Sequence, residues 1–161
     1  SNYKGFYWNP NNREINTNAF KDVDVIIHLA GANVAKRWTK TYKQEILDSR
    51  IKSTKLLFST LSSINNKVAQ IISASAVGIY PSSISQIYHE EDGVVDNSFL
   101  GSVVHKWEQE VNRFEELNIK VAKIRIGIVL AKNGGALQEM AKPIKYGKPG
   151  PSQCCSRSDV S

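Results

Sequence analysis

Three short apolar segments, each followed by small residues, alternate along the chain with two longer amphipathic segments. The first apolar segment, residues 23–30, is rich in β-branched residues and ends at Gly31, as a strand covered by helices on both faces does. Residues 68–73 repeat this layout and lead into a loop of small residues. Residues 120–130 alternate, with Ile124, Ile126 and Ile128 on one side and Arg125 on the other. We therefore predict three strands.

Two helices are predicted between these strands. Thr41 with Gln44 three residues later forms a capping-box pattern, and the helix that it begins extends to about Ser63. A second helix begins at Asn97 or Ser98. The apolar positions of both recur at three and four, including Leu47, Ile51, Leu57, Phe58, Leu61, Val103, Val104, Trp107, Val111 and Phe114. Strands and helices in this order predict an α/β fold with a doubly wound parallel sheet.

The remaining segments are shorter or polar. We expect residues 3–8 to form an aromatic strand that ends at a run of turn-forming residues, and residues 17–21 to form at most one helical turn. Residues 81–97 lack a hydrophobic period, which predicts a long surface loop near a site. Residues 136–144 are expected to form a short helix. No G-x-G-x-x-G fingerprint occurs in the sequence.

The composition limits the classes of protein to which the chain can belong. The 161 residues, 41% hydrophobic and 22% charged, fit one globular domain, and no stretch is long and apolar enough to cross a membrane. The two cysteines, Cys154 and Cys155, are adjacent, which fits a reducing, cytoplasmic location and excludes a disulfide framework. The three histidines show no metal-ligand spacing, so we expect no metal site.

The net charge of +6 arises from lysines and arginines scattered among acids. Without a zinc-finger spacing or an aromatic RNA-binding motif, this pattern argues against nucleic acid as a partner. A mildly basic protein can favour anionic ligands such as dinucleotide phosphates.

Several motifs together resemble a known family. They are His28-Leu29-Ala30-Gly31, Lys36-Arg37-Trp38-Thr39, Asp48-Ser49-Arg50, Ser73-Ala74-Ser75-Ala76-Val77-Gly78-Ile79-Tyr80, Trp107-Glu108, Arg125-Ile126-Gly127-Ile128-Val129-Leu130 and Gly134-Gly135-Ala136-Leu137. Over about residues 8–147 the chain resembles the atypical extended short-chain dehydrogenases/reductases of the NAD-dependent epimerase/dehydratase type, which include cell-division-inhibitor homologues. The resemblance implies a Rossmann-like fold that binds NADP or NAD.

The resemblance also implies a set of cofactor-binding residues, namely Leu29, Ala30, Gly31, Glu45, Arg50 and Val129. Arg50 has support from the pattern itself, because a guanidinium on an otherwise apolar helix face is costly unless it meets an anion or several acceptors. An arginine that extends to the surface from a helix edge is the alternative.

The residues available for catalysis differ from the family pattern. Short-chain reductases use Tyr and Lys four residues apart, so that the ammonium lowers the pKa of the phenol, and this chain has no Tyr-x-x-x-Lys. Ala76 takes the position of the usual serine. Ser75 and Tyr80 are then the candidate catalytic hydroxyls, with hydrogen bonding within the loop as the alternative.

The resemblance predicts that the family's glycine-rich first strand-turn-helix and its second strand lie before Ser1. We therefore expect a fragment with a partial cofactor domain at residues 1–147 and an atypical tail at residues 148–161. The intact protein is expected to be an epimerase or reductase acting on an unidentified small molecule. A cofactor-sensing regulatory protein without turnover is the alternative. The sequence fixes neither the substrate, nor the choice of cofactor, nor the oligomeric state.

Overall fold

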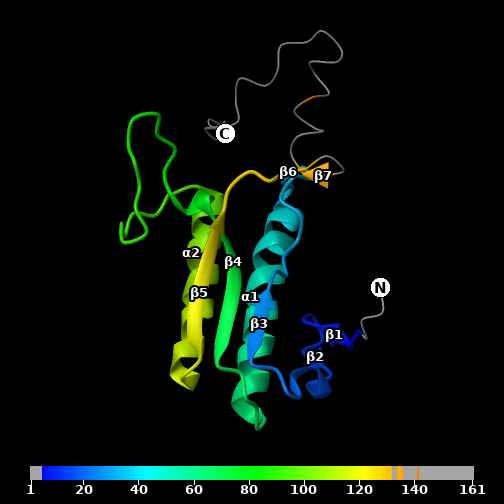
Figure 1. Ribbon diagram of the computed structural model, residues 1–161. Helices are drawn as coiled ribbons and strands as arrows, with labels where there is room; N and C mark the ends of the chain where they lie inside the picture. The colour runs from blue at the N-terminus through cyan, green and yellow to red at the C-terminus, as the bar shows by residue number, and fades with distance from the viewer. Residues whose placement is uncertain (1–4, 132–133, 136–140, 142–161) are drawn as a thin grey trace.

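The computed structural model describes residues 5–131, 134–135 and 141 of the chain (Figure 1). Its centre is a parallel sheet in the order β3-β4-β5, with β3 at Val25–His28, β4 at Gln70–Ala76 and β5 at Lys120–Ile126. Helix α1 (Lys40–Ser63) connects β3 to β4, and helix α2 (Phe99–Asn112) connects β4 to β5. The predicted α/β fold with a partial parallel sheet is confirmed.

Both helices pack against the same face of the sheet and lie behind it in the view of Figure 1. Two right-handed crossovers that add strands in the same direction place their helices on one side. The prediction that residues 23–30 are covered on both faces is therefore wrong for this chain. Val25 is 45% exposed and Ile27 66% exposed, whereas His28 on the helix side is buried.

The alternation of residues 120–130 is present, but its apolar side is the open one. Ile124 and Ile126 are 54% and 38% exposed, whereas Lys123 and Arg125 between and before them face the helices and contact Glu108 of α2. The strand also ends earlier than expected. After residues 127–129, a short strand β6 (Leu130–Ala131) pairs antiparallel with β7 (Gly134–Gly135).

Helix α1 begins two residues earlier than the capping-box pattern suggests. Thr39 is the N-cap, and its side chain accepts a hydrogen bond from the N–H of Tyr42 at 3.1 Å. The capping box at Thr41 is therefore wrong, because Thr41 already lies within the first turn. The predicted end at Ser63 is confirmed. The buried face of α1 is centred on Ile46, Ser53, Thr54, Leu56, Leu57, Thr60 and Leu61.

Helix α2 begins as predicted, with Ser98 as N-cap. Its start is packed closely against the preceding loop, since a Cβ on Gly101 would lie 2.2 Å from the carbonyl oxygen of Asp96. A 3₁₀ turn, η3 (Arg113–Leu117), continues the helix. The hydrophobic core gathers toward the amino ends of the strands and contains Phe20, Leu57, Leu61, Val68, Ile71, Phe114 and Ile119.

The N-terminal segment lies outside the parallel sheet. Of the expected strand at residues 3–8, residues 3–4 lie outside the described residues and residues 5–7 are not in a strand. A two-residue strand β1 (Trp8–Asn9) pairs antiparallel with β2 (Glu14–Ile15) across the asparagine-rich turn. The predicted single helical turn is confirmed as η1 (Thr17–Phe20).

Between β4 and α2 lies only the 3₁₀ turn η2 (Val77–Ile79), so the predicted long loop at residues 81–97 is confirmed. Within the described ranges, no helix has the length and apolar character needed to cross a bilayer. Of the short helix expected at residues 136–144 only residue 141 is described, and the tail from residue 148 lies outside the described residues.

Candidate functional site

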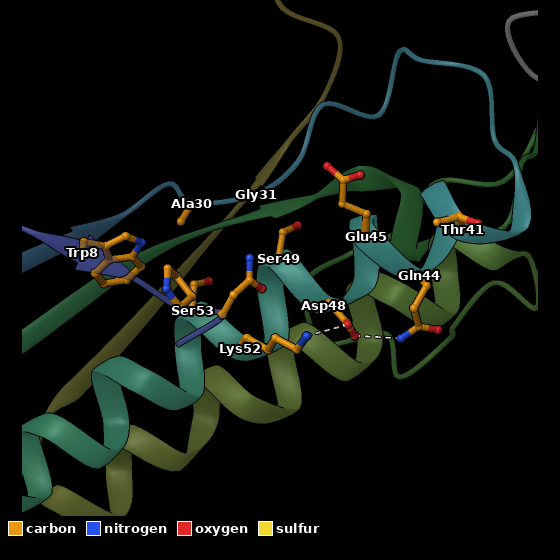
Figure 2. A pocket seen from close by; sticks show the side chains of 12 residues that line it. Trp8, Ala30, Gly31, Thr41, Gln44, Glu45, Asp48, Ser49, Lys52 and Ser53 are labelled. Carbon is orange, nitrogen blue, oxygen red and sulfur yellow. Dashed lines mark hydrogen bonds and ion pairs between the residues drawn. The ribbon is translucent and has the colours of Figure 1, made fainter. Parts of the chain in front are cut away.

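A pocket of about 520 Å³ lies where the carboxyl end of β3 meets α1, and Figure 2 shows its lining. Ala30 and Gly31 form one side, and the side chains of α1 form the other. Its lining residues are Trp8, Pro10, Asn11, Ala30, Gly31, Thr41, Gln44, Glu45, Asp48, Ser49, Lys52 and Ser53. Ligands of open α/β sheets lie at this edge, outside the carboxyl ends of the strands.

The helix side of the pocket is polar because residues spaced by three and four lie on one face of α1. Asp48 accepts hydrogen bonds from Gln44 Nε2 at 2.7 Å and contacts Lys52 Nζ at 2.9 Å. The hydrogen bond from Lys52 holds the pKa of Asp48 below its ordinary value. The side chains of Thr41 and Glu45 make no hydrogen bond or ion pair with the described residues, so they remain available to a ligand.

The strand side of the pocket is fastened to α1. The N–H of Ala32 donates to Ser49 Oγ at 2.9 Å, and Arg50 Nη2 donates to the carbonyl of Ala32 at 3.3 Å. Arg50 Nη1 donates to the carbonyl of Ile46 at 2.9 Å. A Cβ on Gly31 would lie 3.0 Å from the guanidinium carbon of Arg50, so glycine permits this close approach. Burial lowers the pKa of Arg50 from its ordinary value.

His28 lies behind the pocket, under α1. Its Nε2 is 3.1 Å from Thr54 Oγ1 and 3.3 Å from Ser53 Oγ, and both hydroxyls donate to the carbonyl of Arg50. Each hydroxyl has one proton, so the imidazole Nε2 must be the donor. Burial lowers the pKa of His28 to about 4. Trp107 of α2 contacts both this ring, edge-on, and Arg50, with the guanidinium 5.2 Å from the indole centroid.

The candidate catalytic hydroxyls are found in a second cluster, at the carboxyl end of β4. Ser75 is 4% exposed and donates a hydrogen bond to Glu108 of α2. Arg125 of β5 binds Glu108 in a bidentate manner, with both nitrogen–oxygen distances at 3.0 Å, and also donates to the hydroxyl of Tyr80. Tyr80 donates in turn to the carbonyl of His89 at 3.1 Å. The cluster therefore joins Ser75 to Tyr80 through an ion pair whose carboxylate is buried and whose guanidinium is partly exposed.

Glu108 is 6% exposed, and its surroundings favour the ionised form. Burial works to raise the pKa of Glu108, but the hydrogen bonds from Arg125 and Ser75, with the charges of Arg125 and Lys123, outweigh it and hold the pKa below its ordinary value. The hydrogen bond to Glu108 raises the pKa of Arg125 in turn. Lys123 Nζ lies 3.6 Å from the same carboxylate. Both shifts favour the charged forms of the pair.

The structure brings together three of the six expected cofactor residues. Ala30, Gly31 and Glu45 line the pocket, and Arg50 lies directly behind Gly31. Leu29 and Val129 do not line it and are 69% and 57% exposed.

Two features escaped the sequence analysis. The polar stripe of α1 was detectable, because Thr41, Gln44, Asp48 and Lys52 recur at helical spacing directly after the strand end. The pairing of Glu108 with Arg125 was not detectable, because the two residues are seventeen positions apart and meet only when α2 packs against β5. No group of His, Cys, Asp or Glu in the described ranges could hold a metal ion.

Comparison with known proteins gives the family. The model of the NAD dependent epimerase/dehydratase family matches residues 5–126. An epimerase family protein of Staphylococcus aureus is 40% identical over 136 residues, 83% of this chain and 45% of its own length. A relative of the same name from Staphylococcus haemolyticus is 42% identical over 125 residues, 78% of this chain and 42% of its own length. The chain thus spans less than half the length of these curated relatives.

Two solved structures agree with this result. A human epimerase family protein solved with NADPH has a TM-score of 0.71 and 29% identity, over 81% of this chain and 45% of its own. A nucleoside-diphosphate sugar epimerase from Corynebacterium glutamicum has a TM-score of 0.70 and 29% identity, over 90% of this chain and 30% of its own. The chain belongs to the NAD dependent epimerase/dehydratase family.

Proposed function

We propose that this chain is part of an NADP- or NAD-dependent epimerase- or reductase-like protein that acts on a small molecule. The observation that carries the proposal is the pocket between Ala30, Gly31 and the polar face of α1, which includes the carboxylate of Glu45, without a partner among the residues that the structure describes. Residues 1–147 are then a partial cofactor domain. The tail at residues 148–161 has no assigned role.

The pocket residues fit one end of a dinucleotide. The small side chain of Ala30 and the bare Gly31 let a flat ring approach the backbone, and the indole of Trp8 adds an aromatic wall. Glu45 supplies an acceptor for a ribose hydroxyl or a ring amino group. A volume of about 520 Å³ suits a ring with its ribose. Arg50 holds the strand end in place, and Leu29 and Val129 border the cofactor from the open face.

The bound nicotinamide would accept and return a hydride. In this proposal Ser75 and Tyr80 supply hydroxyls at the carboxyl end of β4, and the Glu108–Arg125 pair fixes their orientation. Arg125 takes the place beside the phenol that lysine has in the Tyr-x-x-x-Lys pattern.

A second candidate is a cofactor-sensing protein without turnover. It is favoured by the engagement of both hydroxyls within the fold, since Ser75 donates to Glu108 and Tyr80 donates to the carbonyl of His89. Transfer of labelled hydride from NADPH to a panel of carbonyl compounds separates the candidates. Turnover supports the enzyme, whereas NADPH binding without any transfer supports the sensor.

The cofactor role is tested by calorimetric titration with NADPH of the wild-type chain and of Arg50→Met. We expect about fivefold weaker binding in the variant, because the loop at Ala32 loses a charge-assisted hydrogen bond. Arg113→Met is a matched control, since Arg113 also lies over an aromatic ring, that of Phe58, and does not line the pocket. Equal dissociation constants for all three proteins would remove Arg50 from the cofactor site.

A further inference from the structure

Four cations lie within eight positions at the start of α1, namely Lys36, Arg37, Lys40 and Lys43. We call these residues and the connecting chain the basic loop, residues 33–43. Lys36, Arg37 and Lys40 are exposed and Lys43 is half-buried. The basic loop thus presents a local concentration of positive charge at the carboxyl edge of the sheet.

No carboxylate of the described residues lies within ion-pair distance of these four cations, whereas Lys52 and Lys55 farther along α1 each pair with one. Lys40 and Lys43 also lie at the amino end of α1, whose first turn contains no acidic residue. Cations at this end of a helix are disfavoured by the helix dipole. Neither the helix dipole nor ion pairing within the described residues therefore accounts for their position.

The basic loop is held in a fixed shape rather than left as solvated side chains. Tyr42 Oη donates to the carbonyl of Asn33 at 2.5 Å, and Trp38 Nε1 donates to the carbonyl of Val34 at 2.8 Å. The ring of Trp38 packs edge-on against Phe99 of α2, with centroids 5.6 Å apart.

Two of the cations are also positioned by aromatic rings. Lys36 Nζ lies 5.3 Å from the ring centre of Tyr42, and Lys43 Nζ lies 5.2 Å from that of Phe99. Cation–π contacts restrain the ammonium groups but do not neutralise their charge. Two of the four charges are thus restrained, and none of the four is paired with a carboxylate in the part of the chain that the structure describes.

The basic loop adjoins the pocket, because Thr41 and Gln44 line the pocket and lie between or next to the cations in the sequence. We propose that the basic loop binds the phosphate or carboxylate group of a small-molecule ligand at this edge of the sheet. The anion belongs either to the dinucleotide or to a second ligand, the substrate. Only the first of these two sources rests on the proposed function.

The test compares two double variants of the chain by calorimetric titration at constant ionic strength. Arg37→Gln with Lys40→Gln removes two charges of the basic loop, and Lys106→Gln with Lys120→Gln removes two exposed charges elsewhere. Each protein is titrated with inorganic pyrophosphate and, separately, with NADPH. We expect the loop variant to bind pyrophosphate about tenfold more weakly, and the control variant to bind it almost as well as the wild type.

The two titrations identify the source of the anion. Weaker binding of both pyrophosphate and NADPH assigns the basic loop to a phosphate of the cofactor. Weaker binding of pyrophosphate alone assigns it to the substrate. Equal losses in both double variants, or no pyrophosphate binding by the wild type, overturn the proposal. Failure of the wild type to bind NADPH counts against the proposed function instead, and the pyrophosphate titration still decides the role of the basic loop.

Discussion

The ends of two neighbouring strands, β3 and β4, have similar sequences but different surroundings. After β3, Ala30 and Gly31 face a row of polar side chains of α1, and Glu45 in that row has no partner among the described residues. After β4, Ser75 faces α2, where Glu108 accepts its hydroxyl and binds Arg125. One strand end thus borders a pocket with free polar groups, and the other borders a closed network.

The difference arises from the helix that covers each strand end. Helix α1 presents alcohol, amide and carboxylate groups at the rim of the pocket, where water keeps them solvated. Helix α2 places Glu108 in the interior, where an unpaired carboxylate would be very costly, so Arg125 must accompany it. We infer that the first strand end is suited to binding a ligand and the second to fixing the positions of two hydroxyls.

The largest expected effect is the loss of the buried pair. Glu108→Ala leaves Arg125 without its carboxylate and should lower the free energy of unfolding by about 4 kcal/mol. Glu110→Ala is the control, since Glu110 is partly exposed and pairs with Lys55 and Arg113 at the surface, and it should cost less than about 1 kcal/mol. Urea denaturation measures both. Similar losses of stability in the two variants would mean that the Glu108–Arg125 pair is no more important for folding than an ion pair at the surface.

The next effect is a pH dependence from His28. Its pKa is about 4 in the folded chain and 6.5 ordinarily, so the unfolded state binds more protons between these values. Stability should therefore fall by about 3 kcal/mol as pH decreases from 6.5 to 4.

Urea denaturation at several pH values measures this slope. In His28→Gln the part of the slope that comes from the imidazole should be absent, whereas replacement of the exposed His105 by Gln should leave the slope intact. An unchanged slope in His28→Gln would show that the imidazole does not stay neutral behind the pocket.

A smaller effect is expected at the candidate hydroxyls. Ser75→Ala removes a hydrogen bond to a carboxylate and should cost about 2 kcal/mol of stability, and Tyr80→Phe should cost about 1 kcal/mol. In a protein with turnover, both should lower the rate of hydride transfer more than they weaken cofactor binding. If both variants transfer hydride at the wild-type rate, Ser75 and Tyr80 are structural residues only.

Local sequence patterns predicted the elements but not their surroundings. The cap at Ser98 and the end of α1 at Ser63 follow from side-chain chemistry within a few residues, and both are confirmed. The exposure of Ile27 and Ile124 was not predictable, because an apolar residue in a strand does not reveal which face of the sheet is covered by helices. The partnership of Glu108 with Arg125 depends on packing between distant segments, which no local period encodes.

The smallest effect on stability is expected at the pocket itself, and it accompanies the most direct test of the cofactor proposal. Ala30→Leu places a larger side chain into the pocket, and Ala35→Leu makes the same change at an exposed position outside it. Both should alter the free energy of unfolding by no more than about 0.5 kcal/mol. Calorimetric titration with NADPH should show binding at least about tenfold weaker in Ala30→Leu, and unchanged binding in Ala35→Leu. Equal dissociation constants for wild type and Ala30→Leu would contradict the assignment of this pocket to the cofactor.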